Sequence, residues 1–142
     1  MQVVSLQKRH IEELAAKGSL GYLAAYLDEE AKNRFAAMKY AFAAEVDGET
    51  VAAAGLLEYW SHRAEAWAFF DPQCRKHFLA VHNAVKRFLQ IAPVRRIEAI
   101  VERDFSAGHR WIKSLGFELE AECLRSYTIE CKDVSLYALI KE

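Results

Sequence analysis

One segment near the end of the chain restricts the possible folds more than any other, because it combines a strand, a short helix and a second strand. The apolar run from Arg96 to Val101 is typical of a strand. The residues that follow, DFSAGHRWIKSLGFE, predict an amphipathic helix that begins near Asp104 or Ser106, since both residue types cap helices well. We expect the helix to end at Gly116, because glycine readily adopts the left-handed conformation past a helix end. Phe117 then begins another strand.

The length and composition favour a single domain inside the cell. Of the 142 residues, 53% are hydrophobic, which is enough for one domain, residues 1–142, with its own core. The net charge of -1 gives no reason to expect nucleic acid or an anionic membrane as a partner. The three cysteines follow no metal-ligand spacing. No apolar run approaches the ~20 residues of a membrane span. We therefore expect a cytoplasmic protein without a metal site.

The remaining chain alternates between helical and strand patterns in a definite order. Hydrophobic spacing predicts helices over residues 7–17, 19–38 and about 75–90. Apolar or alternating runs predict strands at residues 3–6, 40–46, 50–59, 64–70, 117–128 and 134–140. Asp47-Gly48 separates two of these strands and is typical of a hairpin turn. The predicted order is strand, two helices, three antiparallel strands, helix, strand, helix and two strands.

This order, with Leu115-Gly116-Phe117 ending the last helix, resembles the GNAT acyltransferase superfamily over the whole chain. The resemblance implies an α/β (α+β) class with the GNAT acyl-CoA N-acyltransferase fold, a mixed, mostly antiparallel twisted sheet with helices on both faces. It implies that acyl-CoA lies where the strand before the central helix splays from its neighbour. The expected cosubstrate is acetyl-CoA, and the expected partner is an amine of a small molecule or protein. A homodimer is left open.

In this family the diphosphate binds to the turn after that strand, because unpaired N–H groups and the helix dipole favour an anion there. The resemblance assigns cofactor binding to Phe69, Phe70, Asp71, Arg75, Lys76, His77, Phe78 and Ala80. Arg75 and Ala80 match the family's pattern for the turn. Phe78 departs from it, since it replaces a glycine that lets the phosphate approach the backbone. The alternative is that Phe78 is the first core residue of the helix and the basic residues are solvated.

Acyl transfer from a thioester to an amine needs a base for the amine proton. We expect Glu65 to be that base. Strand alternation places it on one face with Trp67 and Phe69. Its distance ahead of Arg75 also resembles that of the catalytic glutamate in histone-type members of the family.

Other assignments of these strands remain open. Glu65 has an alternative role, in which it is exposed at the strand start and pairs with Arg63 or His62. Glu58 on the neighbouring strand is the second candidate base. An aromatic wall for the acceptor would consist of Tyr59, Trp60 and Trp67.

The resemblance also implies an acid for the leaving sulfur, often a tyrosine of the short helix. Ile112 has that place here, and it cannot donate a proton. A thiolate with a pKa of about 8.5 is a tolerable leaving group, so we expect slower chemistry rather than none. Phe78 and Ile112 favour the alternative function, which is a degenerate GNAT-fold protein that binds CoA or a partner without catalysis.

Overall fold

The computed structural model describes the backbone of residues 1–142 and every side chain except that of Tyr22. Its elements are β1 (Gln2–Ser5), α1 (Lys8–Ala16), the 3-10 helix η1 (Gly21–Tyr26), α2 (Glu29–Ala37), β2 (Tyr40–Val46), β3 (Glu49–Trp60), β4 (Arg63–Phe70), the 3-10 helix η2 (Pro72–His77), α3 (Phe78–Ile91), β5 (Arg96–Glu102), α4 (Ser106–Ser114), β6 (Glu118–Leu124) and β7 (Val134–Ile140). The strands follow one another in the predicted order along the chain.

The sheet has the strand order β1-β2-β3-β4-β5-β7-β6. β4 and β5 are parallel, whereas the pairs β1–β2, β2–β3, β5–β7 and β6–β7 are antiparallel. The predicted α+β class and the mixed, mostly antiparallel sheet are therefore confirmed.

The chain forms two compact units, and two strands pass from one unit to the other. Unit 1 contains Met1–Leu57 and Trp67–Gln90, and unit 2 contains Glu58–Ala66 and Ile91–Glu142. The end of β3 and the start of β4 belong to unit 2. Both units have buried apolar side chains of their own, such as Leu14 in unit 1 and Ile97 in unit 2. The single-domain organisation stays a prediction.

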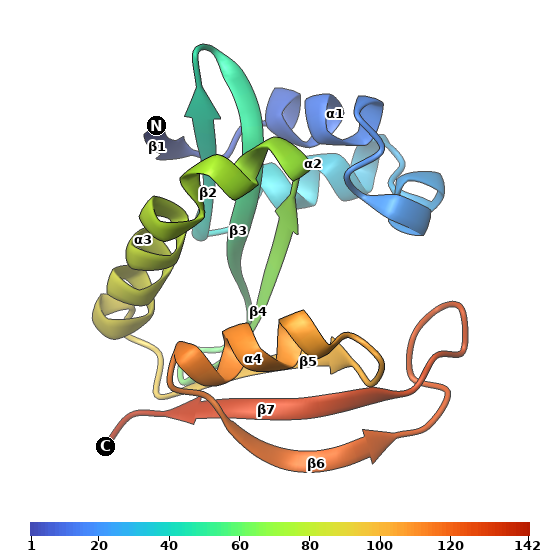
Figure 1. Ribbon diagram of the computed structural model, residues 1–142, viewed down its shortest axis with the longest axis vertical. Coiled ribbons are helices and arrows are strands. Elements are labelled where there is room, and N and C mark those ends of the chain that lie inside the picture. Colours follow the sequence, from blue (N-terminus) through green and yellow to red (C-terminus); the bar gives the residue numbers. More distant parts are fainter. The chain divides into compact units, whose positions relative to one another are not determined.

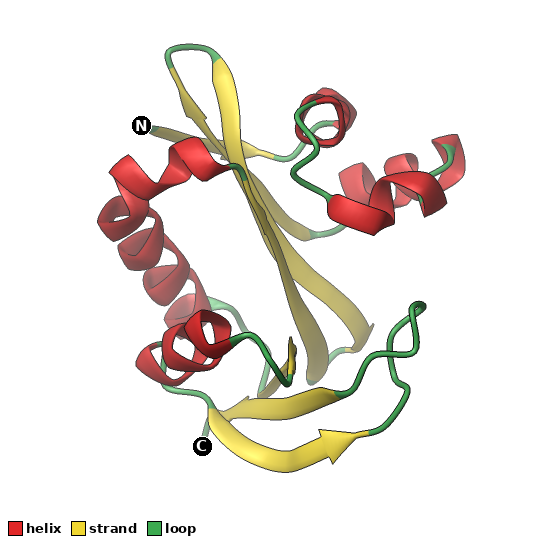
Figure 2. Cartoon of the chain, turned by 45° about the vertical axis from the view of Figure 1, so that its right-hand side comes forward, coloured by secondary structure: helices red, strands yellow, loops and turns green.

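In unit 1, helices lie on both faces of the strands, as predicted. α1 and α2 cover one face and α3 covers the other (Figures 1 and 2). One core cluster joins the strands to α1, through Leu6, Ile11, Leu14, Leu20, Ala41, Ala43 and Ala53. The other joins them to η2 and α3, through Ala44, Val51, Ala52, Cys74 and Val81. Because successive strand residues point to opposite faces, the small residues of β2 and β3 contribute to both clusters.

In unit 2, α4 lies along the strands β5 and β7 (Figure 1). Its buried Ile112, together with Leu115 and Phe117, contributes to the core of this unit. The helix ends where the sequence predicts, because Gly116 follows it with a φ of 98°.

Two predicted helices differ from the observed ones in their extent. Residues 19–38 do not form one helix but η1 and α2. Asp28 separates them, because its backbone is extended and its side chain accepts a hydrogen bond from the N–H of Ala31 at 2.8 Å. It therefore caps a new helix. The helix predicted from about Arg75 begins at Phe78, and the residues before it form η2.

One helix cap and one strand end in unit 2 also differ from the prediction. α4 begins at Ser106, as expected, but its N-cap residue is Phe105 and no side-chain hydrogen bond caps this helix. The strand predicted over residues 117–128 ends at Leu124. Ser126 has a φ of 51°, and its N–H donates to Asp133 Oδ1 at 2.9 Å, so the backbone turns out of the strand there.

Candidate functional site

The predicted site residues lie on β3, on β4 and on the segment that leads from η2 into α3. Glu58, Tyr59, Trp60 and Glu65 belong to unit 2, and the remaining residues, from Trp67 to Ala80, belong to unit 1. In the described register, β4 pairs with β5 through Arg63, Ala64 and Glu65. The expected base is therefore the last residue of this parallel ladder.

The side chain of Glu65 is held by a tyrosine. Tyr59 Oη donates a hydrogen bond to Glu65 Oε2 at 2.6 Å, across the turn between β3 and β4. This hydrogen bond and, after it, burial raise the pKa of Tyr59 to about 12, so the phenol remains a donor at neutral pH. The alternative pairing of Glu65 with Arg63 or His62 is wrong, because Arg63 binds Glu98 and His62 accepts from the indole of Trp60.

An ion-pair network on β5 fixes Arg63. The buried Glu98 accepts hydrogen bonds from Arg63 Nε at 2.5 Å and from Arg96 Nε at 2.8 Å. Arg96 makes two further hydrogen bonds to Glu120 on β6. The hydrogen bond from Arg63 does most to lower the pKa of Glu98, and the hydrogen bond from Arg96 lowers it further. Glu98 is thereby held ionised as a structural carboxylate.

Tyr59 and Trp60 form an exposed aromatic pair beside the same arginine. The central guanidinium carbon of Arg63 lies 4.6 Å from the ring centroid of Tyr59 and 4.9 Å from that of Trp60. The two residues are 45% and 50% exposed. Their rings therefore take part in cation–π contacts with a side chain of this protein. Glu58, the second candidate base, is exposed on the same strand.

Trp67, the third residue of the predicted aromatic wall, packs within unit 1. Its ring meets Phe35 of α2 edge-on, with the centroids 4.8 Å apart, and lies 5.5 Å from Phe69. Its Nε1 is a buried polar atom without a hydrogen-bond partner among the described residues. The observed contacts of Trp67 are those of a core residue, and its contact with substrate stays a prediction.

The segment after β4 places basic side chains immediately before a helix start. Asp71 caps η2, because its carboxylate accepts a hydrogen bond from the N–H of Gln73 at 2.9 Å. Its other oxygen accepts from the hydroxyl of Ser19 at 3.0 Å. The last turn of η2 contains Arg75, Lys76 and His77. α3 follows directly with Phe78. Basic donors and the positive end of a helix dipole thus belong to one short stretch of chain.

An anion is favoured where basic side chains and a helix N-terminus coincide, so this donor set is suited to an anionic group. That this group is the diphosphate of acetyl-CoA stays a prediction. Phe78 is 42% exposed, so the alternative that it is a buried core residue is wrong. Its ring centroid lies 6.4 Å from that of His82. Cys74, in the same segment, is buried, and burial and then the charge of Asp71 raise its pKa. Its thiol therefore stays protonated and is a poor nucleophile.

A histidine of α4 and a tyrosine of β7 make a contact that sequence reasoning missed. His109 Nε2 lies 3.0 Å from the carbonyl oxygens of Glu102 and Arg103, so it carries the proton, and Nδ1 accepts from Tyr137 Oη at 2.7 Å. Tyr137 is only 2% exposed, and the pair joins α4 to β5 and β7. No local pattern indicates a contact between residues 28 positions apart. Ile112, at the place of the family's tyrosine, is 7% exposed and contributes only packing.

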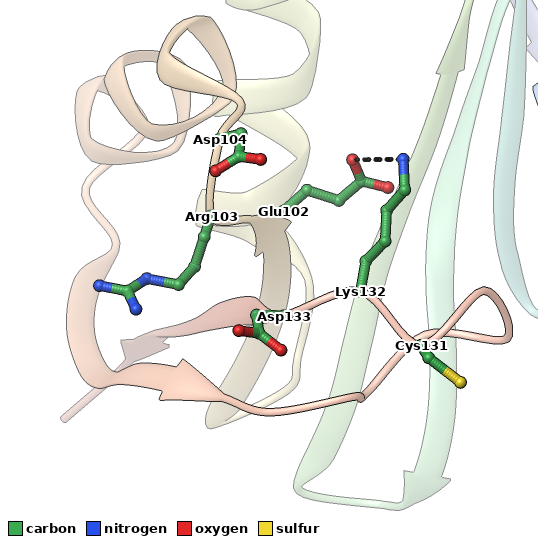
Figure 3. A pocket seen from close by; sticks show the side chains of 6 residues that line it. All are labelled: Glu102, Arg103, Asp104, Cys131, Lys132 and Asp133. Atoms are coloured by element: carbon green, nitrogen blue, oxygen red, sulfur yellow. Dashed lines mark ion pairs between the residues drawn. The ribbon is translucent and has the colours of Figure 1, made fainter.

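A polar hollow of about 590 Å³ opens in unit 2, and none of the predicted site residues is among those that line it. Its lining residues come from the end of β5 and from the loop before β7, and they are Glu102, Arg103, Asp104, Cys131, Lys132 and Asp133 (Figure 3). Lys132 Nζ lies 3.9 Å from Glu102 Oε2, and Arg103 pairs with Glu122 at 3.4 Å. One ion pair therefore joins two lining residues, and Arg103 pairs with a glutamate outside the hollow.

Two further features concern membranes and metals. None of the described helices has both the length and the apolar character needed to cross a membrane. Within the described residues, no three His, Cys, Asp or Glu side chains are grouped so that they could bind a metal ion.

Comparisons with known proteins give no match in sequence but several in structure. No family model and no curated protein sequence matches the chain. The crystal structure of Ard1 from Thermoplasma volcanium superposes with a TM-score of 0.81 at 16% identity, over 99% of this chain and 97% of that chain. A probable acetyltransferase from Staphylococcus epidermidis ATCC 12228 gives 0.80 at 12% identity, over 99% of both chains. An acetyltransferase of the GNAT family from Streptococcus pneumoniae gives 0.75 at 15% identity, again over 99% of both. The expected fold is thereby confirmed: this chain has the fold of the GNAT acetyltransferases.

Proposed function

We propose that the protein is an N-acetyltransferase that moves an acetyl group from acetyl-CoA to an amine. One observation carries the proposal: a half-buried carboxylate, Glu65, is held in one position by Tyr59 at the end of the ladder between β4 and β5. A fixed carboxylate in a protein of this fold suits general-base work, because the base must stand within hydrogen-bond reach of the proton it takes.

The proposal assigns the cosubstrate to residues that follow Glu65 along the chain. Arg75, Lys76 and His77 would bind the diphosphate, together with N–H groups of the first turn of α3. Ala80 is small enough for the ligand to come close to that turn. Phe69 and Phe70, at the end of β4, would pair with the pantetheine through their backbone. In this set, Phe78 is the residue whose side chain is larger than the one in the family's pattern, which has glycine at that position.

Acetyl-CoA, when bound, supplies a thioester whose carbonyl carbon accepts a nucleophile. Glu65 takes a proton from the amine, the nitrogen–carbon bond forms, and the carbon–sulfur bond breaks. The sulfur leaves as thiolate and takes its proton from water, because Ile112 offers none. The products are an amide and free CoA. The acceptor can be a small-molecule amine, a protein N-terminus or a lysine.

A non-catalytic role is the second candidate function, and two observations favour it. Phe78, with its aromatic side chain, is the first residue of α3, in the turn to which the proposal assigns the diphosphate. The family's proton donor on α4 is replaced by the buried Ile112. In that case the protein would bind CoA, or a partner, without turnover.

The test is a thiol-release assay with acetyl-CoA and a panel of small amines, lysine peptides and peptides with free N-termini, from pH 6 to 10. Glu65→Gln keeps the shape of the side chain and removes the base, so the rate should fall about 100-fold or more. Glu118→Gln, at an exposed position of β6, is the matched control and should retain the wild-type rate.

Three results would separate the candidates. Equal rates for wild type and Glu65→Gln at every pH would reject Glu65 as the base. Absence of turnover with every acceptor, while calorimetry shows acetyl-CoA binding, would favour the non-catalytic role. Absence of both turnover and binding would reject the acetyl-CoA proposal itself.

A further inference from the structure

A chain of contacts leads from a buried carboxylate of β5 to the expected base. Glu98 binds Arg63 through two hydrogen bonds, from Nε at 2.5 Å and from a terminal nitrogen at 3.1 Å. Arg63 stacks on the ring of Tyr59 at 4.6 Å. Tyr59 Oη then donates to Glu65 Oε2 at 2.6 Å. Every contact lies within unit 2, so the series depends on no other part of the chain.

Each contact restricts the next one. A bidentate carboxylate fixes the plane of a guanidinium group, and a fixed guanidinium limits the movement of an aromatic ring stacked on it. The phenol oxygen of Tyr59 is then held at one place, although the residue is 45% exposed. A glutamate side chain at a surface would otherwise sample several rotamers, whereas a donor at 2.6 Å favours one of them.

We propose that Tyr59 is a positioning residue for the acetyl transfer: it holds Oε2 of Glu65 and leaves Oε1 as the oxygen that takes the amine proton. The inference rests on the proposed function, in which Glu65 is the base. It differs from the sequence-based expectation that Tyr59 lines a wall for the acceptor, because the role now belongs to the hydroxyl and not to the ring.

Tyr59 can donate to Glu65 only while its hydroxyl is protonated. The titratable groups around that hydroxyl are Glu65, Arg63 and Tyr127. The hydrogen bond to Glu65 and, after it, burial raise the pKa of Tyr59 to about 12, whereas the positive charge of Arg63 acts in the opposite direction. The hydroxyl is therefore still protonated at a pH near 10, where lysine-type amines lose their proton (ordinary pKa about 10.4). The hydrogen bond from Tyr59 to Glu65 therefore persists over the whole pH range in which an amine loses its proton and becomes a nucleophile.

The first measurement tests the contact without any turnover. Tyrosine ionisation is followed by NMR of ¹³C-labelled tyrosine in the whole protein, with the Tyr59 signal identified from its loss in Tyr59→Phe. In the wild type Tyr59 should titrate near pH 12. In Glu65→Gln it should titrate at a lower pH, closer to the ordinary value of about 10, because the charged acceptor is gone.

The second measurement tests the role in catalysis. Tyr59→Phe keeps the ring on Arg63 and removes only the hydroxyl, so it should lower kcat about 10-fold and leave KM for acetyl-CoA unchanged. Tyr26→Phe, which removes the hydroxyl of a tyrosine with 56% exposure in η1, is the matched control and should retain the wild-type kcat. Urea unfolding of Tyr59→Phe checks that a lower kcat does not come from lost stability.

The outcomes distinguish this inference from the proposed function. A wild-type kcat for Tyr59→Phe beside a slow Glu65→Gln overturns the positioning role while Glu65 remains the base. Titration of Tyr59 at the same pH in wild type and Glu65→Gln overturns the contact itself. A wild-type rate for Glu65→Gln rejects Glu65 as the base, and with it this inference, while acetyl transfer itself stands. No turnover with any acceptor rejects the proposed function and this inference together.

Discussion

The close approach of β2, β3 and Trp67 makes Gly55 the position at which a single methyl group should do most harm. A Cβ atom built on Gly55 would lie 2.4 Å from the carbonyl oxygen of Tyr40 and 2.8 Å from Cζ2 of Trp67. Gly55 is paired with Ala41 in the ladder between β2 and β3, so the carbonyl of Tyr40 belongs to backbone that cannot rotate away. We therefore expect Gly55→Ala to force the two strands or the indole apart.

The loss of stability expected for Gly55→Ala depends on whether the new Cβ meets backbone or a flexible side chain, and here the nearest atom is a backbone oxygen. Overpacking a core costs about 1–3 kcal/mol, and a clash with fixed backbone belongs at the upper end of that range. The lower entropy of the unfolded alanine chain offsets only about 0.5 kcal/mol. A net loss of about 2.5 kcal/mol corresponds to a Tm lower by roughly 8 °C for a chain of this size.

The assay is urea unfolding followed by circular dichroism, with the thermal midpoint as a second reading. The control is Gly48→Ala in the hairpin between β2 and β3, where a Cβ would meet nothing within 4 Å but φ is 81°. That variant carries only the backbone strain of a left-handed alanine, about 1 kcal/mol. If Gly55→Ala is no less stable than Gly48→Ala, the close approach of the strands and Trp67 is not as described, and the reasoning fails.

Three further predictions concern the charges and the turn before α3. Glu98→Gln should destabilise the protein by about 1–2 kcal/mol at pH 7, because it removes the charged acceptor of two partly exposed arginines, of which Arg96 keeps Glu120 and Arg63 keeps no ion pair among the described side chains. The pKa of Glu98 is lower in the folded protein than the unfolded value of 4.5, so Glu98 stabilises the fold above that pH and ceases to do so as the pH falls through its folded-state pKa. The difference in unfolding free energy between wild type and Glu98→Gln, measured in urea, should therefore narrow between pH 5 and 3. A difference that stays constant would contradict this. Arg75→Glu should weaken acetyl-CoA binding in calorimetry by about 10-fold or more, since it places a negative charge at the diphosphate turn, and an unchanged affinity would exclude that turn. Phe78→Gly should tighten acetyl-CoA binding and cost only about 1 kcal/mol of stability, because the side chain is 42% exposed; a stable variant with unchanged affinity would show that the ring does not limit the turn.

The element order and the fold class could be predicted from the sequence, because local features carry them. The hairpin at Asp47-Gly48 and the end of α4 at Gly116 depend on residues that favour particular backbone angles. The strands are recognised from runs of apolar residues. Errors occurred where two local structures share one pattern: residues 19–38 have helical spacing, but a 3-10 helix and an α-helix capped at Asp28 satisfy it as well.

Single residues of the candidate site could be named from the sequence, and their order along β4 followed from alternation. Alternation and the resemblance to the family made Glu65 the candidate base, and the family's turn pattern pointed to the basic stretch that begins at Arg75. Both assignments stay predictions. The departure at Phe78 was also visible, since one large residue stands where the family has glycine. What the pattern left undecided was whether that ring is buried, because one apolar residue at a helix start fits a core or a surface equally well.

The tertiary structure alone decided which of these side chains meet. Tyr59 binds Glu65 across the turn between β3 and β4. Arg63 binds Glu98 and not the nearby Glu65, because β4 pairs with β5 in a register that brings Arg63 close to Glu98. Trp67 packs against Phe35 of a distant helix, a contact that no spacing along the chain encodes. Local sequence sets the backbone angles of each segment, whereas hydrogen bonds and packing depend on distances between segments that only the folded chain fixes.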